Sequence, residues 1–151
     1  MLETPHESIS RRLPAIATEY GQAPLLESAI ARDLWRDFAT YNVSIASELA
    51  AIYTITRTDD PEPYSTSADQ SADLLAGRML VSDQHCDHPV WSVDENVAFR
   101  VAHDILGHHS IRAGFDRAGE IDVYLYSLGI VPRLFHPCLW VESIGQLAYA
   151  V

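Results

Sequence analysis

The stretch from residue 96 to residue 120, NVAFRVAHDILGHHSIRAGFDRAGE, carries the residue types best suited to chemistry. On a helical wheel of about 100° per residue, apolar side chains cover one side of residues 96–108. Solvated helix faces are usually built from Lys, Glu and Gln, whereas imidazole and carboxylate groups bind metal ions and transfer protons. We therefore interpret the opposite arc as a candidate metal site, which carries Asn96, Arg100, His103, Asp104, Gly107 and His108.

The spacing of these residues sets a geometric condition on the site. Asp104 and His108 lie four residues apart, so their side chains meet on one helix face and can bind one ion. His103 and His108 lie five residues apart, about 140° around the wheel, unlike the i, i+4 histidines of zincins. Either the helix is distorted near Gly107, or the two histidines do not share a metal. Glycine in a helix interior costs about 1 kcal/mol, so Gly107 indicates close approach of another segment or a ligand.

Two further carboxylates follow in the sequence. Glu120 begins the next expected helix and is a candidate additional ligand. Glu142 lies in the apolar segment LWVESIGQL, four residues before Gln146, so we expect both side chains on one helix face. A buried glutamate requires a partner or a metal ion. The alternatives are that Glu142 lies at an exposed rim and that Glu120 only complements a helix dipole. Likewise, if the polar arc is only a solvent-exposed helix face, Arg100 and Asp104 form an ordinary ion pair between residues four apart.

A second polar cluster, HCDHP at residues 85–89, has residue types that bind metals. Its spacing matches no tetrahedral zinc pattern, and no second CxxC or HxxxH arm completes it. We therefore favour a polar surface loop, with metal binding by this loop as the alternative and with His88 within expected reach of His103. The sequence has no glycine-rich phosphate loop and no GxSxG motif.

The elements that must position these residues are predominantly helical. Apolar residues recur at three- and four-residue steps over residues 24–56, which predicts one long amphipathic helix, or two with a bend near residues 41–43. Further helices are expected at 67–76, ended by Gly77, and at 93–109, capped by Ser92. Others are expected at 120–128, ended by Gly129, and from 139 onward. Residues 78–90 are expected to be irregular, and strand signals are weak. We predict an all-α fold, a compact bundle of five or six helices.

Length and composition predict one domain with a hydrophobic core. The chain has 151 residues, of which 48% are hydrophobic. Residues 1–23 are predicted to form an N-terminal extension and residues 24–151 a single helical domain, with the site within residues 96–146. No apolar run approaches the ~20 residues of a membrane helix, and the first residues lack the apolar region of a signal peptide. Together with only two cysteines, these features predict a cytoplasmic protein.

The net charge of −11 restricts the partners. Ten Lys and Arg residues against 21 Asp and Glu residues argue against non-specific binding to nucleic acids and to membranes. A small-molecule substrate or a protein with a basic surface is expected instead. The aromatic residues of the long helix, Trp35, Phe38 and Tyr41, fit core packing, with a homodimer seam as the alternative.

Three motifs in combination resemble the core of a family of small helical proteins and domains of actinobacteria and their phages, including phage polyvalent proteins. The motifs are N-x-x-F-R-x-x-H-D-x-x-G-H, G-F-x-x-x-G-E and E-x-x-G-Q, and the resemblance covers roughly residues 63–151. It implies a polar site built from separate helices. The matching residues are Asn96, Phe99, Arg100, His103, Asp104, Gly107, His108, Gly114, Phe115, Gly119, Glu120, Glu142, Gly145 and Gln146.

A looser similarity links the adjacent His103 and Asp104 to HD-type phosphohydrolases, which are also all-α and use such a pair as metal ligands. This similarity and the polar arc lead to our first hypothesis, a metal-dependent hydrolase of a nucleotide or another small phosphorylated or amide-bearing substrate. One divalent ion (Zn, Mn, Fe or Mg) would be bound by His103, Asp104, His108 and Glu120.

The first hypothesis assigns roles to four other residues. Water activated by the metal would be the nucleophile, Glu142 the general base, and Arg100 the clamp for an anionic group. Asn96 and Gln146 are candidates for binding the cofactor. The second hypothesis is a non-enzymatic helical binding module, a phage or mobile-element adaptor or inhibitor of a host protein, in which the same polar residues form a structural site.

Overall fold

Helix α2 (Ala29–Ala50) is the longest element of the computed structural model, which describes residues 2–22 and 29–149. Trp35, Phe38 and Leu49, which belong to the apolar pattern that predicted this helix, are buried. The helix continues through residues 41–43 without a break and ends at Ala50 rather than near residue 56. Its predicted start near residue 24 lies outside the described residues.

The structure contains two short strands that the sequence did not predict. One lies where the end of the long helix was expected, and the other lies in a segment expected to be irregular. Strands β1 (Thr54–Thr58) and β2 (Arg78–Ser82) pair in parallel and are connected by helix α3 (Ser67–Leu75). The predicted α3 is confirmed, and Gly77 follows it with a φ of 80°. The prediction for the strand residues was wrong, because five residues are too few for a clear alternation and their partners are distant in sequence.

The polar arc lies on helix α4 (Val93–Ala102) and on the π-helix η1 (His103–His109) that continues it. Ser92 caps α4 as predicted. Its side chain accepts a hydrogen bond from the backbone N–H of Glu95, and the Glu95 carboxylate accepts one from the backbone N–H of Ser92. This capping box fixes where the helix starts and therefore which residues face the site.

The rest of the chain forms helices beside α4. Helix α5 (Arg117–Ser127) is followed by the 3-10 turn η2 (Arg133–Phe135) and by α6 (His136–Trp140), the π-helix η3 (Val141–Gly145) and α7 (Gln146–Tyr149). Because α6, η3 and α7 follow one another without a break, the described residues contain six helices. The predicted single-domain, mostly helical bundle is confirmed.

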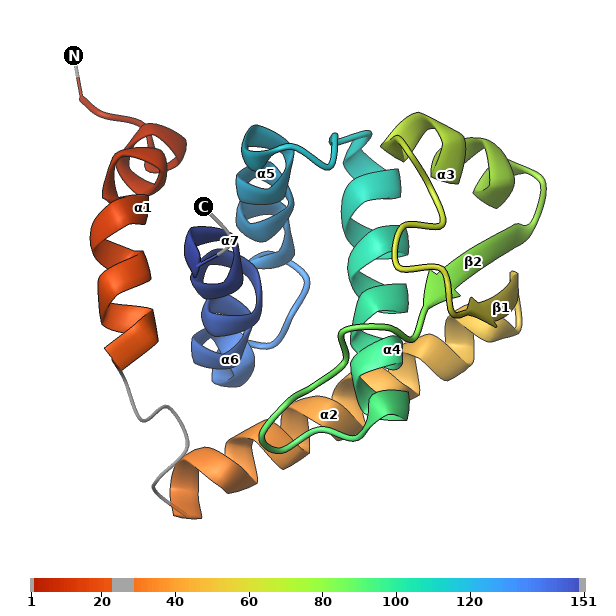
Figure 1. Cartoon of the computed structure of the whole chain (residues 1–151), viewed down its shortest axis with the longest axis horizontal. Helices are drawn as coiled ribbons and strands as arrows, with labels where there is room; N and C mark the ends of the chain where they lie inside the picture. The colour runs from red at the N-terminus through yellow and green to blue at the C-terminus, as the bar shows by residue number, and fades with distance from the viewer. Residues whose placement is uncertain (1, 23–28, 150–151) are drawn as a thin grey trace.

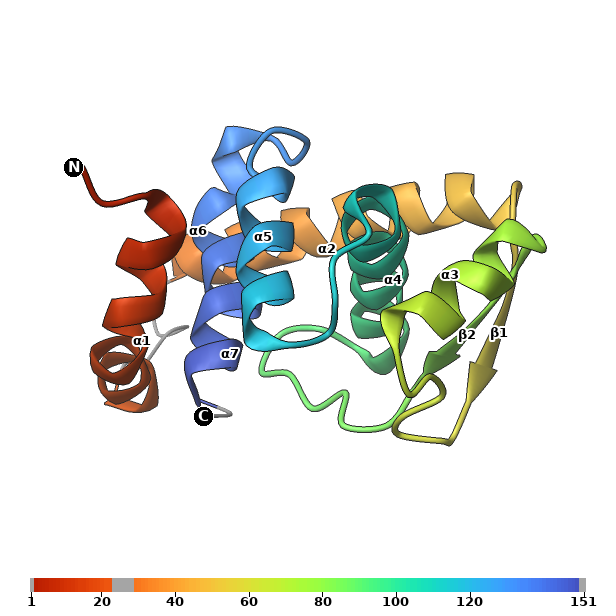
Figure 2. The same cartoon turned by 90° about the horizontal axis from the view of Figure 1, so that it is seen from above.

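The segment before residue 24 is more than a polar tail. Its helix α1 (Pro5–Gln22) packs against α5, η3 and α7 and buries Leu13 and Ile16. Figures 1 and 2 show α1 beside the α5–α7 group, with α3 and the strands on the far side of α4. Helix α4 therefore separates the two parts of the core. No helix among the described residues has both the length and the apolar character to cross a bilayer.

Two hydrophobic clusters hold these parts together. The larger cluster includes Phe38, Ile121 and Ile144 and joins α1, α2 and the α5–α7 group. The smaller cluster includes Met79 and Val101 and joins α3, the strands and α4. The polar arc of α4 and η1 thus lies where elements from both halves of the sequence meet.

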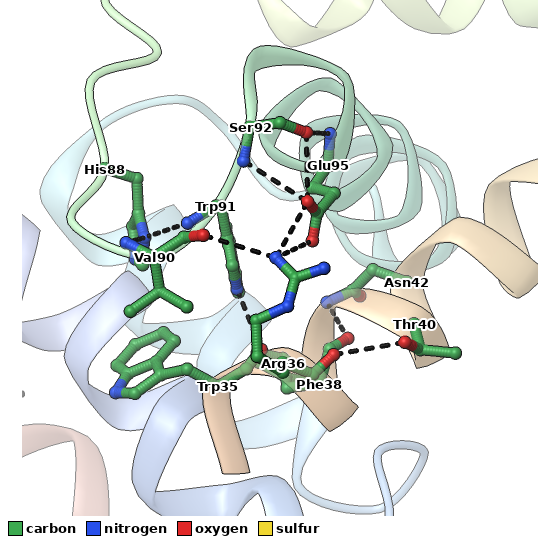
Figure 3. A network of polar contacts seen from close by, with 10 residues as sticks. All are labelled: Trp35, Arg36, Phe38, Thr40, Asn42, His88, Val90, Trp91, Ser92 and Glu95. Atoms are coloured by element: carbon green, nitrogen blue, oxygen red, sulfur yellow. Dashed lines mark hydrogen bonds and ion pairs between the residues drawn. The ribbon is translucent and has the colours of Figure 1, made fainter. Parts of the chain in front are cut away.

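An ion pair joins the start of α4 to α2. Arg36 donates to Glu95 at 2.9 Å and to the carbonyl oxygen of Val90 at 3.3 Å, as Figure 3 shows. Burial raises the pKa of Glu95, but the hydrogen bonds from Arg36 and Ser92 outweigh burial, so its pKa lies below 4.5. The free energy that this carboxylate contributes is therefore present above pH 4.5 and is lost as the pH falls through the lowered pKa.

We expect Glu95→Gln to lower the free energy of unfolding at neutral pH by about 1 kcal/mol, because it weakens both the capping box and the Arg36 pair. The difference from wild type shrinks as the pH falls below 4.5. Urea unfolding as a function of pH measures both effects, with Glu48→Gln on the exposed face of α2 as the control. An equal loss at every pH would contradict the electrostatic part of this account.

Candidate metal site

The π-helix η1 resolves the spacing of the two histidines. A π-turn is wider than an α-turn, so residues five apart lie on the same side of it. The imidazole rings of His103 and His108 accordingly lie 5.0 Å apart between their centroids. Of the two alternatives that the sequence left open, the structure shows the distorted helix. A Cβ on Gly107 would lie 2.5 Å from a methyl group of Val123, so the glycine allows η1 to pack closely on α5.

Glu120 joins both imidazoles from the first turn of α5. Its two carboxylate oxygens lie 3.2 Å from His103 Nε2 and 3.1 Å from His108 Nε2. Burial raises the pKa of Glu120, but hydrogen bonds from the two histidines outweigh burial and bring the pKa to about 2. Glu120 is therefore an ionised carboxylate at the point where the two ring nitrogens converge.

The orientation of His108 is fixed by the backbone. Its Nδ1 atom lies 3.2 Å from the carbonyl oxygen of Ala113, and because a carbonyl only accepts, Nδ1 carries a proton. Burial lowers the pKa of this side chain, which is 1% exposed, but the hydrogen bond and charge of Glu120 outweigh burial and raise it. Nε2 is the atom that faces the site, as in metal-binding histidines whose other nitrogen is held by a carbonyl group.

Asp104 is the third member of the group on η1. Its carboxylate accepts a hydrogen bond of 2.8 Å from Gln70 on α3, and no ion pair joins it to Arg100 among the described residues. Burial raises the pKa of Asp104, because it outweighs the opposing effects of His103 and Gln70. One ligand atom from each of His103, Asp104 and His108 lies within 4.8 Å of the others, so this group could hold a metal ion.

The group lies beside two cavities. The larger, of about 800 Å³, is lined by His103, Glu120 and Glu142, and by the predicted residues Asn96, Arg100 and Gln146. The smaller, of about 410 Å³, is lined by Asp104 and Gln70, and it shares Arg100 and Phe115 with the larger. The structure thus brings together the predicted site residues of α4, η1, α5, η3 and α7, although the buried His108 lines neither cavity.

Glu142 lies on the second π-helix, η3, and is held by two side chains. His88 Nε2 lies 2.9 Å from one carboxylate oxygen, and Gln146 donates to the other at 2.6 Å. His88 Nδ1 accepts the backbone N–H groups of Val90 and Trp91, which leaves its proton on Nε2, where it points to Glu142. Figure 3 shows His88 in this orientation, stacked beside Trp91. Glu142 is buried, so the interpretation as a rim residue was wrong.

Arg100 is engaged by the backbone of the loop after β2. Its guanidinium group donates to the carbonyl oxygens of Ser82 at 3.0 Å, Gln84 at 2.8 Å and His85 at 2.8 Å. These contacts hold the start of the loop that leads to His88. They favour a positioning role for Arg100 over the predicted role of anion clamp.

Two residues that support the site were missed or misassigned at the sequence level. Gln70, the partner of Asp104, is 34 residues away and has no distinguishing motif. His88 lies in the HCDHP cluster, which we expected to be a surface loop. Its side chain points inward and contacts Glu142 rather than His103. In the same loop His85 is exposed, and Cys86 is buried in the smaller hydrophobic cluster, where burial raises the pKa of its thiol.

The motif resemblance implied a polar site built from separate helices. One residue or more from each motif, namely His103, Glu120, Glu142 and Gln146, lines the larger cavity, and the three motifs lie on separate helical segments. Membership in the resembled family stays a prediction. Searches of family models, curated proteins and solved structures give no match to this chain.

Proposed function

We propose that this protein is a metal-dependent hydrolase that binds one divalent ion between η1 and α5. The observation that carries the proposal is the π-turn, which directs the Nε2 atoms of His103 and His108 to the carboxylate of Glu120. Asp104 lies next to these groups, and an open cavity of about 800 Å³ adjoins them. A regular α-helix would separate the two imidazoles by about 140° and provide no such site.

The donor set fits a divalent transition metal. Imidazole nitrogens suit Zn²⁺, Fe²⁺ and Mn²⁺ better than Mg²⁺, which prefers oxygen ligands. The groups behind the ligands also fit, because the Ala113 carbonyl orients His108 and the Gln70 amide orients Asp104. Burial raises the pKa of the Asp104 carboxyl group, because it disfavours the charged form. A bound cation would offset this effect by stabilising the carboxylate.

The surrounding residues support hydrolysis. A bound ion would lower the pKa of a coordinated water molecule toward neutrality and polarise the bond to be cleaved. Glu142 lines the same cavity and is the proton acceptor in our proposal, because His88 and Gln146 each bind one of its oxygens and hold it in place. Arg100 acts as a positioning residue for the loop that carries His88.

Metal content tests the ligand assignment. We expect the purified protein, after reconstitution with Zn²⁺, to bind about one equivalent, and His103→Ala to retain less than a tenth of it because tight binding requires three or four protein ligands. His109→Ala is the matched control, since His109 lies on the same π-helix but contacts Ser71 instead. Elemental analysis after gel filtration provides the measurement. Equal metal content in wild type and His103→Ala would overturn the proposed site.

Chelation separates a catalytic site from a structural one. The site residues bond to one another, through the contacts of His103 and His108 with Glu120 and of Gln70 with Asp104. EDTA-treated protein should therefore keep its helical circular-dichroism spectrum, with a lower Tm because a bound ion no longer stabilises the folded state. Unfolding on chelation would instead favour the non-enzymatic module with a structural metal.

A further inference from the structure

The larger cavity has an unusual balance of charge. Its lining includes the carboxylates of Asp87, Glu120 and Glu142 but only one permanent cation, Arg100. The guanidinium of Arg100 already donates to three carbonyl oxygens. Its two terminal nitrogens are therefore engaged and do not offer a pair of N–H groups for bidentate binding of a phosphate. With Asp104 and a divalent ion included, the formal charge around the site is still negative by one. An anionic phosphate ester would meet like charge there.

The side chain of Asn96 is a polar group that lines this cavity. Asn96 on α4 is 7% exposed and lines the cavity, and no hydrogen bond joins its side chain to any residue that the structure describes. A carboxamide offers one acceptor and two N–H donors, which complement the N–H and C=O groups of another amide. A ligand without these groups would cover the carboxamide without bonding to it, and such mismatches are the strongest basis for discrimination between small molecules.

Apolar side chains accompany Asn96. Phe99, Phe115 and Leu147 also line the cavity, and Phe115 is 38% exposed at its wall. Aromatic and aliphatic surface next to a single amide-binding group fits an acyl chain or a peptide-like substituent. Polyanionic ligands gain little from such a surface.

We infer that the substrate is an uncharged or cationic amide, bound through its amide group to Asn96 with its acyl part against Phe99 and Phe115. This inference rests on the proposed function and narrows it from phosphorylated or amide substrates to amides. In the reaction, water adds to the carbonyl carbon and the C–N bond breaks. The acyl group leaves as a carboxylic acid, and the amine takes up a proton.

Affinity selection tests this substrate class. The probes are a library of N-acetylated tripeptide amides and a matched library of the same tripeptides phosphorylated on serine, each incubated with Zn²⁺-loaded protein. Bound members are separated by gel filtration and quantified by mass spectrometry. We expect the wild type to retain N-acetylated members and not phosphorylated ones. Asn96→Leu, a substitution of similar volume, should retain about tenfold less, the effect of losing one to two hydrogen bonds.

Two controls separate the failure of this inference from the failure of the proposed function. Gln84→Leu removes an exposed carboxamide outside the cavity lining and should bind the library like the wild type. Metal content, measured on the same samples, reports the proposed function independently. Preferential retention of phosphorylated members, or equal retention by wild type and Asn96→Leu, would overturn the amide assignment even if one equivalent of Zn²⁺ is bound.

Discussion

Gly119→Ala should lower the free energy of unfolding by about 3 kcal/mol, the upper end of the usual range for overpacking. A Cβ at this position would overlap the carbonyl group of Gly114 and lie 2.8 Å from its backbone nitrogen. Backbone atoms cannot rotate away as a flexible side chain can, so the turn before α5 must move. Urea unfolding followed by circular dichroism measures the loss.

The same substitution should also reduce metal affinity, because Glu120 follows directly and its carboxylate contacts both imidazoles. Gly129→Ala is the control, since its Cβ would lie at an ordinary contact distance of 3.5 Å from the Tyr126 carbonyl oxygen. We expect this control to change stability by less than about 1 kcal/mol. A Gly119→Ala protein with wild-type stability and metal content would show that the turn between η1 and α5 does not position Glu120.

The second large effect is expected for His88→Leu, which should destabilise the protein by about 3 kcal/mol. The side chains of His88 and Glu142 are 6% and 3% exposed, and the substitution leaves the Glu142 carboxylate buried with Gln146 as its remaining described donor. It also removes the acceptor for the backbone N–H groups of Val90 and Trp91. Thermal and urea unfolding provide the measurement.

A double-mutant cycle identifies the cause of this loss. If the unpaired carboxylate dominates, the double variant His88→Leu/Glu142→Leu should be more stable than His88→Leu alone. His136→Leu is a comparison from the same chain, because His136 donates a single hydrogen bond to the Val131 carbonyl and its loss should cost about 1 kcal/mol. Strictly additive effects in the cycle would contradict a stabilising contact between His88 and Glu142.

Features set by neighbouring residues could be predicted from the sequence. Ser92 and Glu95 form a capping box whose partners are three residues apart, so the start of α4 was visible in the pattern. Gly77 ends α3 for a similarly local reason. The polar arc of α4 and the pairing of Glu142 with Gln146 also follow from helical spacing. Helical spacing does not determine how separate elements pack, so it identified these residues without their partners on other elements.

Features that depend on tertiary packing could not be predicted in this way. The π-turn at His103–His109 contains Gly107, which packs closely against Val123 on a different helix. Gln70 reaches Asp104 from α3, and α3 is held by a parallel strand pair whose strands are 24 residues apart in register. The sequence therefore indicated which residues belong to the site, and the structure shows how they converge.

The π-turn in η1 also bears on how such a site can arise. A π-turn accommodates one residue more than an α-turn of the same height, so it is equivalent to a single-residue insertion in an otherwise regular helix. Removing one residue between His103 and His108 would place the two histidines four apart, and an ordinary α-turn would then keep both imidazoles on one face. The π-turn therefore compensates for the extra residue and gives His103 and His108 the common face that a regular α-helix gives to residues four apart.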